Sequence, residues 1–304
     1  MAHQWEAEAT IEPEMALQLI QQQFPELGAN KIKFLGAGWD NSAFLVDKSL
    51  IFRFPRRKIA LPLLETEWCI LPKLAPLVSL PIPVPTWKGT PSPSFPWSFI
   101  GYRMLPGVTA CHANLSEKER ATLAQPLGQF LATLHALPLS IIDNCAIEGN
   151  NKDRIDGSLL TKKIIDNFKE LSQLGLLKNE AKLMSVLDNS QHFRSPIASH
   201  LVHGDFYVRH ILVDEKRQLA GVIDWGDVHT GDPAIDLAIA HSFLPIEAHE
   251  QFIKAYGEIS PETWALAKLR ALYGSTLLVL FGTHSGDQAI AREGLRTLAT
   301  ICKT

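Results

Sequence analysis

The sequence predicts an α+β protein with a small antiparallel sheet near the N-terminus and a larger, mostly helical C-terminal part. Residues 31–55 alternate apolar and polar side chains and are interrupted by glycines and an Asp-Lys-Ser turn, which is typical of short antiparallel strands. Most of the chain after Ser116 instead repeats its apolar residues at helical spacing. A proline-rich stretch, residues 80–96, separates the two patterns, and we place the boundary between residues 1–105 and 106–304.

The composition is that of an ordinary globular protein. At 304 residues, with 46% hydrophobic and 20% charged residues, the chain can bury one large core or the cores of two lobes. The formal net charge of -3 leaves no excess of lysine and arginine to neutralise phosphates, so we do not expect a nucleic-acid partner. We expect a monomer or a weak dimer.

Nothing in the sequence indicates export or a membrane. The N-terminus is acidic and lacks a basic end followed by an apolar core, and no run of about eighteen apolar residues occurs. The four cysteines, Cys69, Cys111, Cys145 and Cys302, form no Cys-x-x-Cys pair, which favours neither a zinc site nor a disulfide framework. We therefore expect a cytoplasmic protein with reduced cysteines and no membrane partner.

The N-terminal elements follow from the periodicity. Residues 11–24 place their apolar side chains mostly on one side of a helix, and residues 31–55 predict two or three antiparallel strands. Residues 60–74 predict a further helix, which carries Glu67. The prolines of the next stretch forbid a central helix but allow an edge strand near Thr86.

Helices dominate the C-terminal part. Ser116 followed by Glu119 is a capping-box pattern, and Pro126 should kink or divide the helix that this box begins. Residues 152–190 predict two helices, and residues 245–304 predict three or four. The strands that carry the candidate chemistry lie between these helical segments.

Two aspartates at the ends of apolar, strand-like runs are the main candidates for chemistry. Asp205 ends SHLVHGD and Asp224 ends LAGVID, and a hairpin of residues 211–213 and 220–223 can bring both carboxylates to one end of a sheet. Two carboxylates in a cleft repel each other unless a cation lies between them or one is protonated. A metal-phosphate site resolves this repulsion; the alternative is that both aspartates merely cap turns.

The spacing around these aspartates resembles that of a known family. The stretch HGDFYVRHIL places His210 five residues after Asp205, and IDWGD follows, in the order that kinases use for phosphoryl transfer. From about Lys31 to the last helices, the chain resembles the aminoglycoside phosphotransferase family. It is also similar to the macrolide 2′-phosphotransferase branch, which often carries the form GD-x-Y-x-x-H. The resemblance implies a protein-kinase-like fold with a small antiparallel-sheet N-terminal lobe and a larger helical C-terminal lobe.

The resemblance assigns roles to the residues of this motif. Asp205 would be the catalytic base, which orients the acceptor hydroxyl and takes its proton, and Asp224 would hold Mg²⁺ on the nucleotide phosphates. His210 stands where the family usually has a metal-binding asparagine. Because imidazole suits magnesium less well than oxygen does, His210 is either a metal ligand or a buried, hydrogen-bonded residue without a metal.

The resemblance also implies that the first strands bind the nucleotide. The turn LGAGWDNS offers the backbone N–H groups of Gly36 and Gly38 to phosphates, with Asn41 and Ser42 close behind. An ordinary turn between two strands is the alternative.

Arg53 is expected to pair with the helix that follows the sheet. It lies fourteen residues before Glu67, which suits the strand-to-helix ion pair of kinases. Lysine is common at this position, but related phosphotransferases also use arginine in a similar setting, and arginine adds a planar fork to the charge. The alternatives are a surface ion pair or a pairing of Arg53 with Glu65.

The segment FIGYRMLPG resembles the strand that joins the two lobes of these enzymes. Backbone groups near Arg103 and Leu105 would then bond the purine base, and Tyr102 would be the bulky residue just before them. A large ring at this position favours guanine over adenine, whereas packing in the core is the alternative.

Further polar residues accompany the two aspartates. Asp232 precedes Pro233 and is typical of a helix N-cap. The resemblance assigns Asp236 to bracing the catalytic turn, and His203 is expected to hold the same loop, with a second general base as the alternative. Asp227 either assists the metal or contacts the substrate.

The implied activity is transfer of the γ-phosphate of ATP or GTP, with Mg²⁺, to a hydroxyl group of a small molecule. The expected acceptor is an antibiotic, either an aminoglycoside or a macrolide. The alternatives are a metabolite kinase and, because of His210 and Arg53, a nucleotide-binding pseudokinase-like module without turnover. A protein kinase is disfavoured because the segment after IDWGD is too short for an activation loop.

Overall fold

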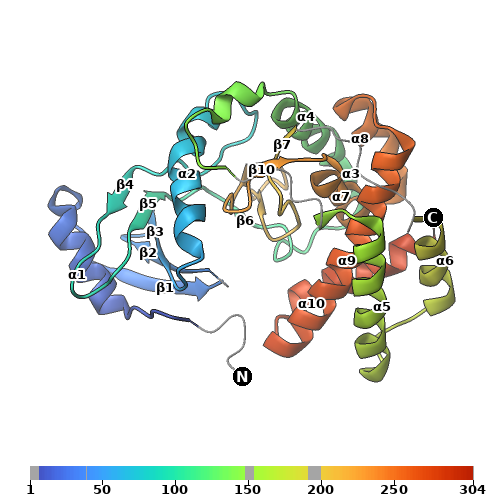
Figure 1. The fold of residues 1–304 in the computed structure, drawn as a ribbon, viewed down its shortest axis with the longest axis horizontal. Coiled ribbons are helices and arrows are strands. Elements are labelled where there is room, and N and C mark those ends of the chain that lie inside the picture. Colours follow the sequence, from blue (N-terminus) through green and yellow to red (C-terminus); the bar gives the residue numbers. More distant parts are fainter. Residues whose placement is uncertain (1–6, 39, 148–153, 191–199, 304) are drawn as a thin grey trace. The chain divides into compact units, whose positions relative to one another are not determined.

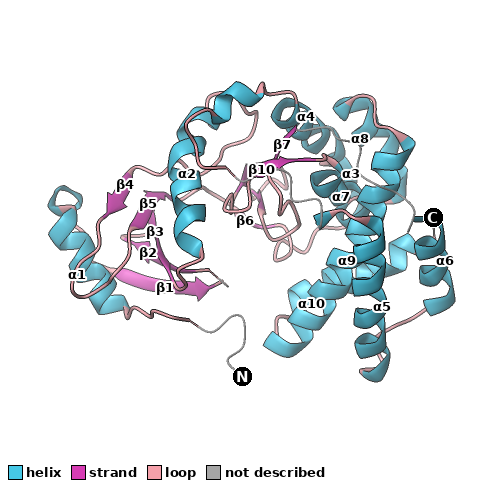
Figure 2. Cartoon of the chain, in the orientation of Figure 1, coloured by secondary structure: helices cyan, strands magenta, loops and turns pink. Residues whose placement is uncertain are grey.

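The computed structural model describes residues 7–38, 40–147, 154–190 and 200–303 of the chain. The chain divides into two units. Unit 1 consists of Met1–Leu77, Pro81–Leu105 and Ser140–Ala146, and unit 2 consists of Val78–Leu80, Pro106–Leu139 and Ile147–Thr304. The largest sheet lies in unit 1, and most of the helices lie in unit 2 (Figure 1, Figure 2).

Unit 1 is built on a five-stranded antiparallel sheet with the strand order β1-β2-β3-β5-β4. Its strands are β1 (Ile32–Ala37), β2 (Asn41–Val46), β3 (Leu50–Pro55), β4 (Trp87–Gly89) and β5 (Phe99–Arg103). The first three are the strands predicted from the alternating pattern, and β4 is the edge strand predicted near Thr86. The proline-rich stretch contributes only this short edge because proline cannot donate a ladder hydrogen bond.

Aromatic side chains fill one face of this sheet, against helix α1 (Pro13–Gln23). Phe52, Phe54 and Phe99 are buried there with Leu19 and Ile20 of α1. The rings of Phe54 and Phe99 stack with their centroids 4.3 Å apart. Burial of each such ring contributes roughly 1.5–3 kcal/mol, so the aromatic cluster holds α1 on the sheet.

The other face of the sheet lies toward helix α2 (Ala60–Leu74), which has the bounds predicted from the sequence (Figure 1). Successive strand residues point to opposite faces, so Arg53, between Phe52 and Phe54 on β3, points away from the aromatic cluster. On that side Arg53 meets Glu67 of α2.

The expectation of reduced cysteines is wrong for two of the four. Cys69 of α2 forms a disulfide with Cys145, which follows the 3₁₀ helix η2 (Leu139–Ile142), and the two Cα atoms are 5.6 Å apart. Nζ of Lys73, one turn further along α2, donates to the carbonyl oxygen of Asp143 at 3.0 Å. The paired cysteines are 76 residues apart, so no local spacing indicates their pairing. The cysteines therefore give no support for a reducing compartment.

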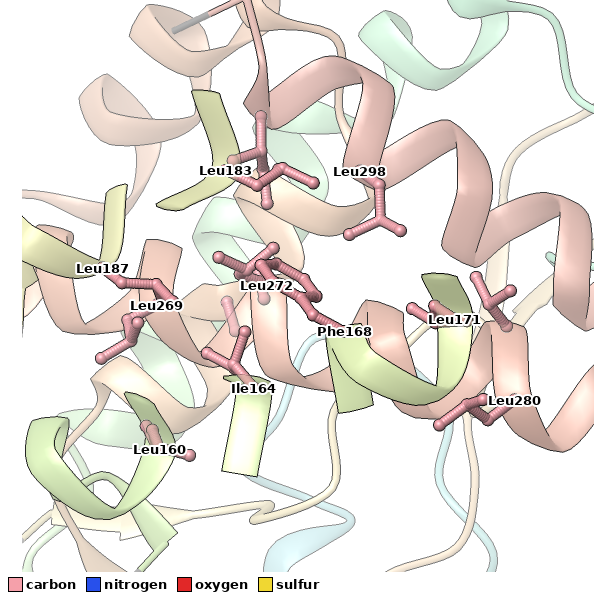
Figure 3. Close-up of a cluster of buried hydrophobic side chains, with 14 residues drawn as sticks. Leu160, Ile164, Phe168, Leu171, Leu183, Leu187, Leu269, Leu272, Leu280 and Leu298 are labelled. Atoms are coloured by element: carbon pink, nitrogen blue, oxygen red, sulfur yellow. The ribbon is translucent and has the colours of Figure 1, made fainter. Parts of the chain in front are cut away.

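Helices form most of the described part of unit 2. They are α3 (Glu117–Thr122), α4 (Ala124–His135), α5 (Gly157–Gln173), α6 (Glu180–Ser190), α7 (Ala234–Phe243), α8 (His249–Tyr256), α9 (Pro261–Ser285) and α10 (Gln288–Ile301). Short 3₁₀ helices occur at Pro25–Leu27 in unit 1 and Ile246–Ala248 in unit 2. Helix α9 packs against α5, α6, α7 and α10. Figure 3 shows the shared core, in which Phe168 of α5 lies beside Leu272 of α9.

By its length and its apolar composition alone, helix α9 could cross a membrane. No such helix was expected from the sequence. Its most apolar window has a mean hydropathy of 1.3, and 56% of that window is buried inside the protein. Its buried residues include Leu269, Leu272 and Val279, which pack in the core of unit 2. The apolar composition of α9 is therefore explained by its place among the other helices.

The start of the helical region follows the predicted local rules. Oγ of Ser116 accepts the N–H of Glu119 at 3.2 Å, and Oε2 of Glu119 accepts the N–H of Ser116 at 2.8 Å, which completes the capping box. The helix is then divided at Leu123. Pro126 lies in the first turn of α4, where the missing N–H costs no helical hydrogen bond.

Short strands position the loops of unit 2. Strands β6 (Val108–Thr109), β8 (Ile211–Val213) and β9 (Leu219–Val222) form an antiparallel sheet, and β7 (His200–Val202) pairs with β10 (His229–Gly231). The β8–β9 pair is the predicted hairpin. Asp205 follows β7 and Asp224 follows β9, so both aspartates lie in loops at strand ends.

Candidate active site

The loop after β7 carries His203, Gly204 and Asp205 and is held by Asp236 of α7. Oδ2 of Asp236 accepts the N–H of His203 at 2.7 Å, and Oδ1 accepts the N–H of Gly204 at 2.9 Å. Nε2 of His135 lies 3.1 Å from Oδ2. Burial opposes ionisation of Asp236, but His135 and these backbone groups outweigh it and lower its pKa. The buried carboxylate therefore stays charged and fixes the loop.

Glycine is required at position 204. Its φ of +84° lies in a region that other residues rarely adopt, and an added Cβ would lie 2.2 Å from the carbonyl oxygen of Asp227. Gly204 thus lets the Asp205 loop and the Asp227 loop approach each other closely.

His203 is fully buried and uses both ring nitrogens within the loop region. With its proton on Nε2, it donates to the carbonyl oxygen of Ile223 at 3.1 Å, and Nδ1 accepts the N–H of Asp205 at 3.3 Å. Its ring packs on Trp225 with the centroids 4.6 Å apart. Burial lowers the pKa of His203 to about 4, so the ring is neutral at physiological pH. This geometry suits a residue that holds the loop.

His210 lies between the two candidate catalytic aspartates. Its Nδ1 donates to the carbonyl oxygen of Asp205 at 2.9 Å and lies 3.5 Å from Oδ2 of the same residue, while Nε2 lies 3.2 Å from Oδ2 of Asp224. Burial favours the neutral ring, but the two carboxylates outweigh it and raise the pKa of His210 to about 9. The imidazole of His210 therefore lies between the two carboxylates, and their charge favours its protonated form.

Asp205 and Asp224 differ in their surroundings. Partial burial raises the pKa of Asp205, Asp227 and Asp224 raise it further, and His210 and Arg270 oppose the rise. A carboxyl group with a raised pKa takes a proton more readily, which suits a general base. Asp224 has a φ of +63°, unusual for a residue other than glycine, so its backbone is held in a strained conformation.

Two arginines that could not be predicted from the sequence belong to this site. Arg154 forms an ion pair with Asp227, and its Nη1 donates to the carbonyl oxygen of Gly204 at 3.2 Å. Arg270, on α9, interacts electrostatically with Asp205 and Asp227. Each is a single arginine outside any motif, so only the folded chain places them beside the aspartates.

Asp232 and His135 support the site from the start of α7 and the end of α4. Oδ1 of Asp232 accepts the N–H of Ala234 at 2.8 Å. The N-cap of α7 is Pro233 and not Asp232 as predicted, so Asp232 lies one residue before the cap. Nδ1 of His135 lies 2.9 Å from the hydroxyl of Tyr256, and its other nitrogen bonds to Asp236. His135 therefore links Tyr256 to the carboxylate that holds the loop.

In unit 1, Arg53 and Glu67 form the predicted ion pair. Nη1 of Arg53 donates to the two carboxylate oxygens of Glu67 at 2.9 and 2.7 Å. Only 3% of the Glu67 side chain is exposed, against 13% for Arg53. The pair is therefore not on the surface, and Glu65 pairs instead with Lys88.

The turn between β1 and β2 contains the two predicted glycines. The N–H of Gly38 donates to the carbonyl oxygen of Asn41 at 2.9 Å, and the strand register shifts between Phe34 and Gly36. Ser42 is buried, and Oδ1 of Asn41 is a buried acceptor with no hydrogen bond to any residue that the structure describes.

The last strand of unit 1 contains the predicted hinge residues. Tyr102 is buried opposite Ile51 of β3, and Arg103 is exposed opposite Leu50. The N–H of Met104 donates to the carbonyl oxygen of Ser49 at 2.8 Å. In the described chain, the N–H of Leu105 makes no hydrogen bond and is available to a ligand.

The side chains near Asp224 include only some of the donors that a metal ion needs. Among the described residues, no group of three or more histidine, cysteine or acidic side chains is arranged to hold a metal. Carboxylate oxygens are suitable magnesium ligands, and Asp224 offers them, but both nitrogens of His210 are engaged by Asp205 and Asp224. The residues present therefore fit magnesium through carboxylate oxygen rather than through imidazole.

The antiparallel sheet of unit 1 and the helical unit 2 together have the fold of kinase-like phosphotransferases. The chain belongs to the phosphotransferase enzyme family, whose family model matches residues 31–272. It is accordingly a phosphotransferase that acts on hydroxyl groups.

Solved structures share this fold. The GDP and kanamycin complex of APH(2")-IIia is 24% identical, covers 93% of this chain and 97% of its own, and has a TM-score of 0.66. The macrolide 2'-phosphotransferase MphH from Brachybacterium faecium is 21% identical, with coverage of 93% and 97% and a TM-score of 0.60. An uncharacterized protein of Bacillus subtilis (strain 168), YcbJ, is 23% identical over an alignment of 244 positions that covers 73% of this chain and 74% of YcbJ.

Proposed function

We propose that this phosphotransferase moves the γ-phosphate of ATP or GTP to a hydroxyl group of a small molecule, with Asp205 as the base. The observation that carries the proposal is the loop of Asp205. Asp236 fixes the loop through two backbone N–H groups, and His210 lies between the carboxyl groups of Asp205 and Asp224. Phosphoryl transfer depends mainly on such positioning and on charge neutralisation.

In the proposed reaction the acceptor oxygen forms a bond to the γ-phosphorus. The bond from that phosphorus to the β–γ bridging oxygen breaks, its electron pair leaves with the nucleoside diphosphate, and the hydroxyl proton goes to Asp205. The raised pKa of Asp205 assists this proton transfer. Magnesium, when bound, would neutralise phosphate charge, with Asp224 as its ligand.

We assign nucleotide contacts in unit 1 on the same grounds. Arg53 is oriented by the buried Glu67, and the guanidinium group of an arginine suits the geometry of a phosphate. The turn with Gly36, Gly38, Asn41 and Ser42 supplies backbone N–H groups, and the free N–H of Leu105 suits the purine base, beside Tyr102 and Arg103. The GDP in the complex of APH(2")-IIia supports a nucleotide site in this fold.

The acceptor class is a separate part of the proposal. The kanamycin bound to APH(2")-IIia and the macrolide activity named for MphH make an antibiotic a candidate acceptor. A metabolite with a hydroxyl group is the second candidate, favoured by the two arginines beside Asp205 and Asp227.

The nucleotide half of the proposal is tested by calorimetric titration of ATP and GTP in magnesium. Arg53→Gln should weaken the binding by roughly 10–100-fold, because a charge-assisted hydrogen bond contributes about 1.5–3 kcal/mol. Arg292→Gln removes one positive charge from an exposed position of α10 and serves as the control. If neither ATP nor GTP binds, the proposal is contradicted. Binding without phosphorylation of any hydroxyl compound would favour the pseudokinase-like module.

A further inference from the structure

The turn between β1 and β2 is held by the two arginines that follow β3. In the described chain, the β1–β2 turn comprises residues 36–38 and 40–42. Nη1 of Arg56 donates to the carbonyl oxygen of Gly38 at 2.6 Å, and the backbone N–H of Arg56 donates to the carbonyl oxygen of Asp40 at 2.7 Å. Arg56 therefore binds the turn on both sides of position 39.

Arg57 forms an ion pair with Asp40, the acidic residue of this turn. Its Nε and Nη2 lie 3.2 and 2.5 Å from Oδ1 of Asp40. The two side chains are 17% and 29% exposed, so water screens the pair less than it screens a fully exposed one. Two hydrogen bonds from one planar guanidinium also restrict the direction of the carboxylate more than a single contact would.

The carbonyl oxygens around position 39 have donors within the protein. Arg56 engages those of Gly38 and Asp40. The N–H of Gly38 donates to the carbonyl oxygen of Asn41 at 2.9 Å. Among the described residues, by contrast, the N–H of Asp40 has no acceptor. A phosphate accepts hydrogen bonds and is repelled by carbonyl oxygens, so this arrangement favours a phosphate at the N–H of Asp40.

Gly38 is not required by the conformation or the packing of the described chain. It is exposed, and its φ lies outside the left-handed region that favours glycine. The nearest atom that an added Cβ would meet is the carbonyl oxygen of Asn41 at 3.9 Å, which is an ordinary contact. The missing side chain instead leaves room for a ligand to approach the backbone.

The charge around the turn is largely balanced. Residues 56–58 carry three positive charges, and Asp40 and Glu8 offset two of them. Oε2 of Glu8 accepts the backbone N–H of Lys58 at 3.3 Å. The positive charge that remains is small and lies at a partly exposed site, where it attracts phosphates only weakly. The contacts that the arginines make are therefore the stronger argument for a role at this turn.

We propose that Arg56 and Arg57 are positioning residues of the nucleotide site and hold the β1–β2 turn in the conformation that binds the phosphates. This inference rests on the proposed function, in which the turn supplies backbone N–H groups to the phosphates. A turn that is ordered before the nucleotide arrives loses less conformational entropy on binding. The arginines thus raise the affinity for the phosphates without touching them.

Asp40→Asn separates positioning from charge. The change removes a negative charge beside the proposed phosphate position, so charge alone would tighten the binding of ATP or GTP. It also breaks the ion pair with Arg57, so positioning predicts binding that is roughly three- to tenfold weaker. Calorimetric titration in magnesium, with whichever nucleotide the wild type binds, measures the affinity. Unchanged or tighter binding in a folded Asp40→Asn protein would overturn the inference.

The arginine variants test the same contacts from the other side. Arg56→Gln and Arg57→Gln should each weaken nucleotide binding by roughly three- to tenfold. The double variant Asp40→Asn/Arg57→Gln should bind no more weakly than its single variants, since all three lack one ion pair. Additive losses would overturn the inference. Lys88→Gln is the matched control, because it breaks a 2.5 Å ion pair with Glu65 elsewhere in unit 1, and should keep the affinity.

Nucleosides distinguish an effect on the phosphates from general damage to unit 1. Adenosine and guanosine lack phosphates, and their affinity, measured by competition, should stay within about twofold of the wild type in every variant. The loss should appear in the KM for the nucleotide, while the KM for the acceptor stays the same. If Arg57→Gln does not fold, Arg57→Lys keeps the charge without the planar fork and should lose part of the nucleotide affinity.

The outcomes for the inference and for the proposed function are distinct. Equal losses of nucleoside and nucleotide affinity, or full nucleotide affinity in both arginine variants, would overturn the positioning role. The proposed function would remain intact in either case, since the wild type still binds and uses the nucleotide. If the wild type binds neither ATP nor GTP, the proposed function itself fails.

Discussion

Nε2 of His210 lies 3.2 Å from Oδ2 of Asp224, so a protonated imidazole is bound to the carboxylate that we propose for magnesium. A cation at this distance competes with a metal for the same oxygen. We predict that His210→Asn, which supplies a neutral oxygen donor, lowers the magnesium concentration for half-maximal turnover by about tenfold. This change corresponds to ~1.4 kcal/mol of magnesium-binding free energy. A magnesium titration of turnover at saturating nucleotide measures this constant. An unchanged constant would mean that His210 and the metal do not compete.

The buried ring of His203 predicts a loss of stability in mild acid. Its pKa is lowered from 6.5 to about 4 in the folded protein, so the unfolded chain binds the proton more readily. The stability is complete above pH 6.5 and is lost as the pH falls from 6.5 to 4, by at most about 3 kcal/mol. Urea unfolding at pH 7 and pH 5 should show a smaller loss for His203→Gln. Equal losses in both proteins would contradict this prediction.

Asp236 is predicted to be needed for the catalytic loop and for stability. Asp236→Ala would leave the buried N–H groups of His203 and Gly204 without acceptors, at a cost of about 2–4 kcal/mol. Asp166 lies on the surface of α5 beside Lys169, so Asp166→Ala is the matched control and should change stability little. Denaturant unfolding compares the two variants. Equal effects of the two changes would show that Asp236 does not hold the loop.

The disulfide between Cys69 and Cys145 predicts a measurable contribution to stability. Replacing both cysteines by serine should lower the free energy of unfolding by about 2–4 kcal/mol, since the bond closes a long loop in the unfolded chain. Cys302→Ser removes a free, half-buried thiol and is the control. Mass spectrometry after alkylation without reductant should find Cys69 and Cys145 unmodified. Alkylation of both in the unreduced protein would contradict the prediction.

The local features of the fold could be predicted from the sequence because they depend on neighbours in the chain. The capping box of Ser116 and Glu119 and the division of the helix near Pro126 follow from backbone hydrogen bonding alone. The spacing of Arg53 and Glu67 fits one strand followed by one helix, so their ion pair was also predictable.

The contacts that the sequence could not predict join distant parts of the chain. Arg154 lies 73 residues from Asp227, and nothing near either residue indicates the pair. Arg270 lies within a long core helix, where a single arginine has no distinctive spacing. The protonation of His210 depends on two carboxylates and on burial, which only the folded chain determines.

The central claim, that Asp205 is the base of a phosphotransferase reaction, is tested most directly by Asp205→Asn. The neutral amide keeps the size of the side chain but cannot take the hydroxyl proton, so kcat should fall by roughly 10²–10⁴-fold on any accepted hydroxyl compound. The affinity for ATP or GTP, measured by calorimetry on the same preparation, should stay within about threefold of the wild type, a difference below 1 kcal/mol. Retained turnover in Asp205→Asn with an intact fold would contradict the account.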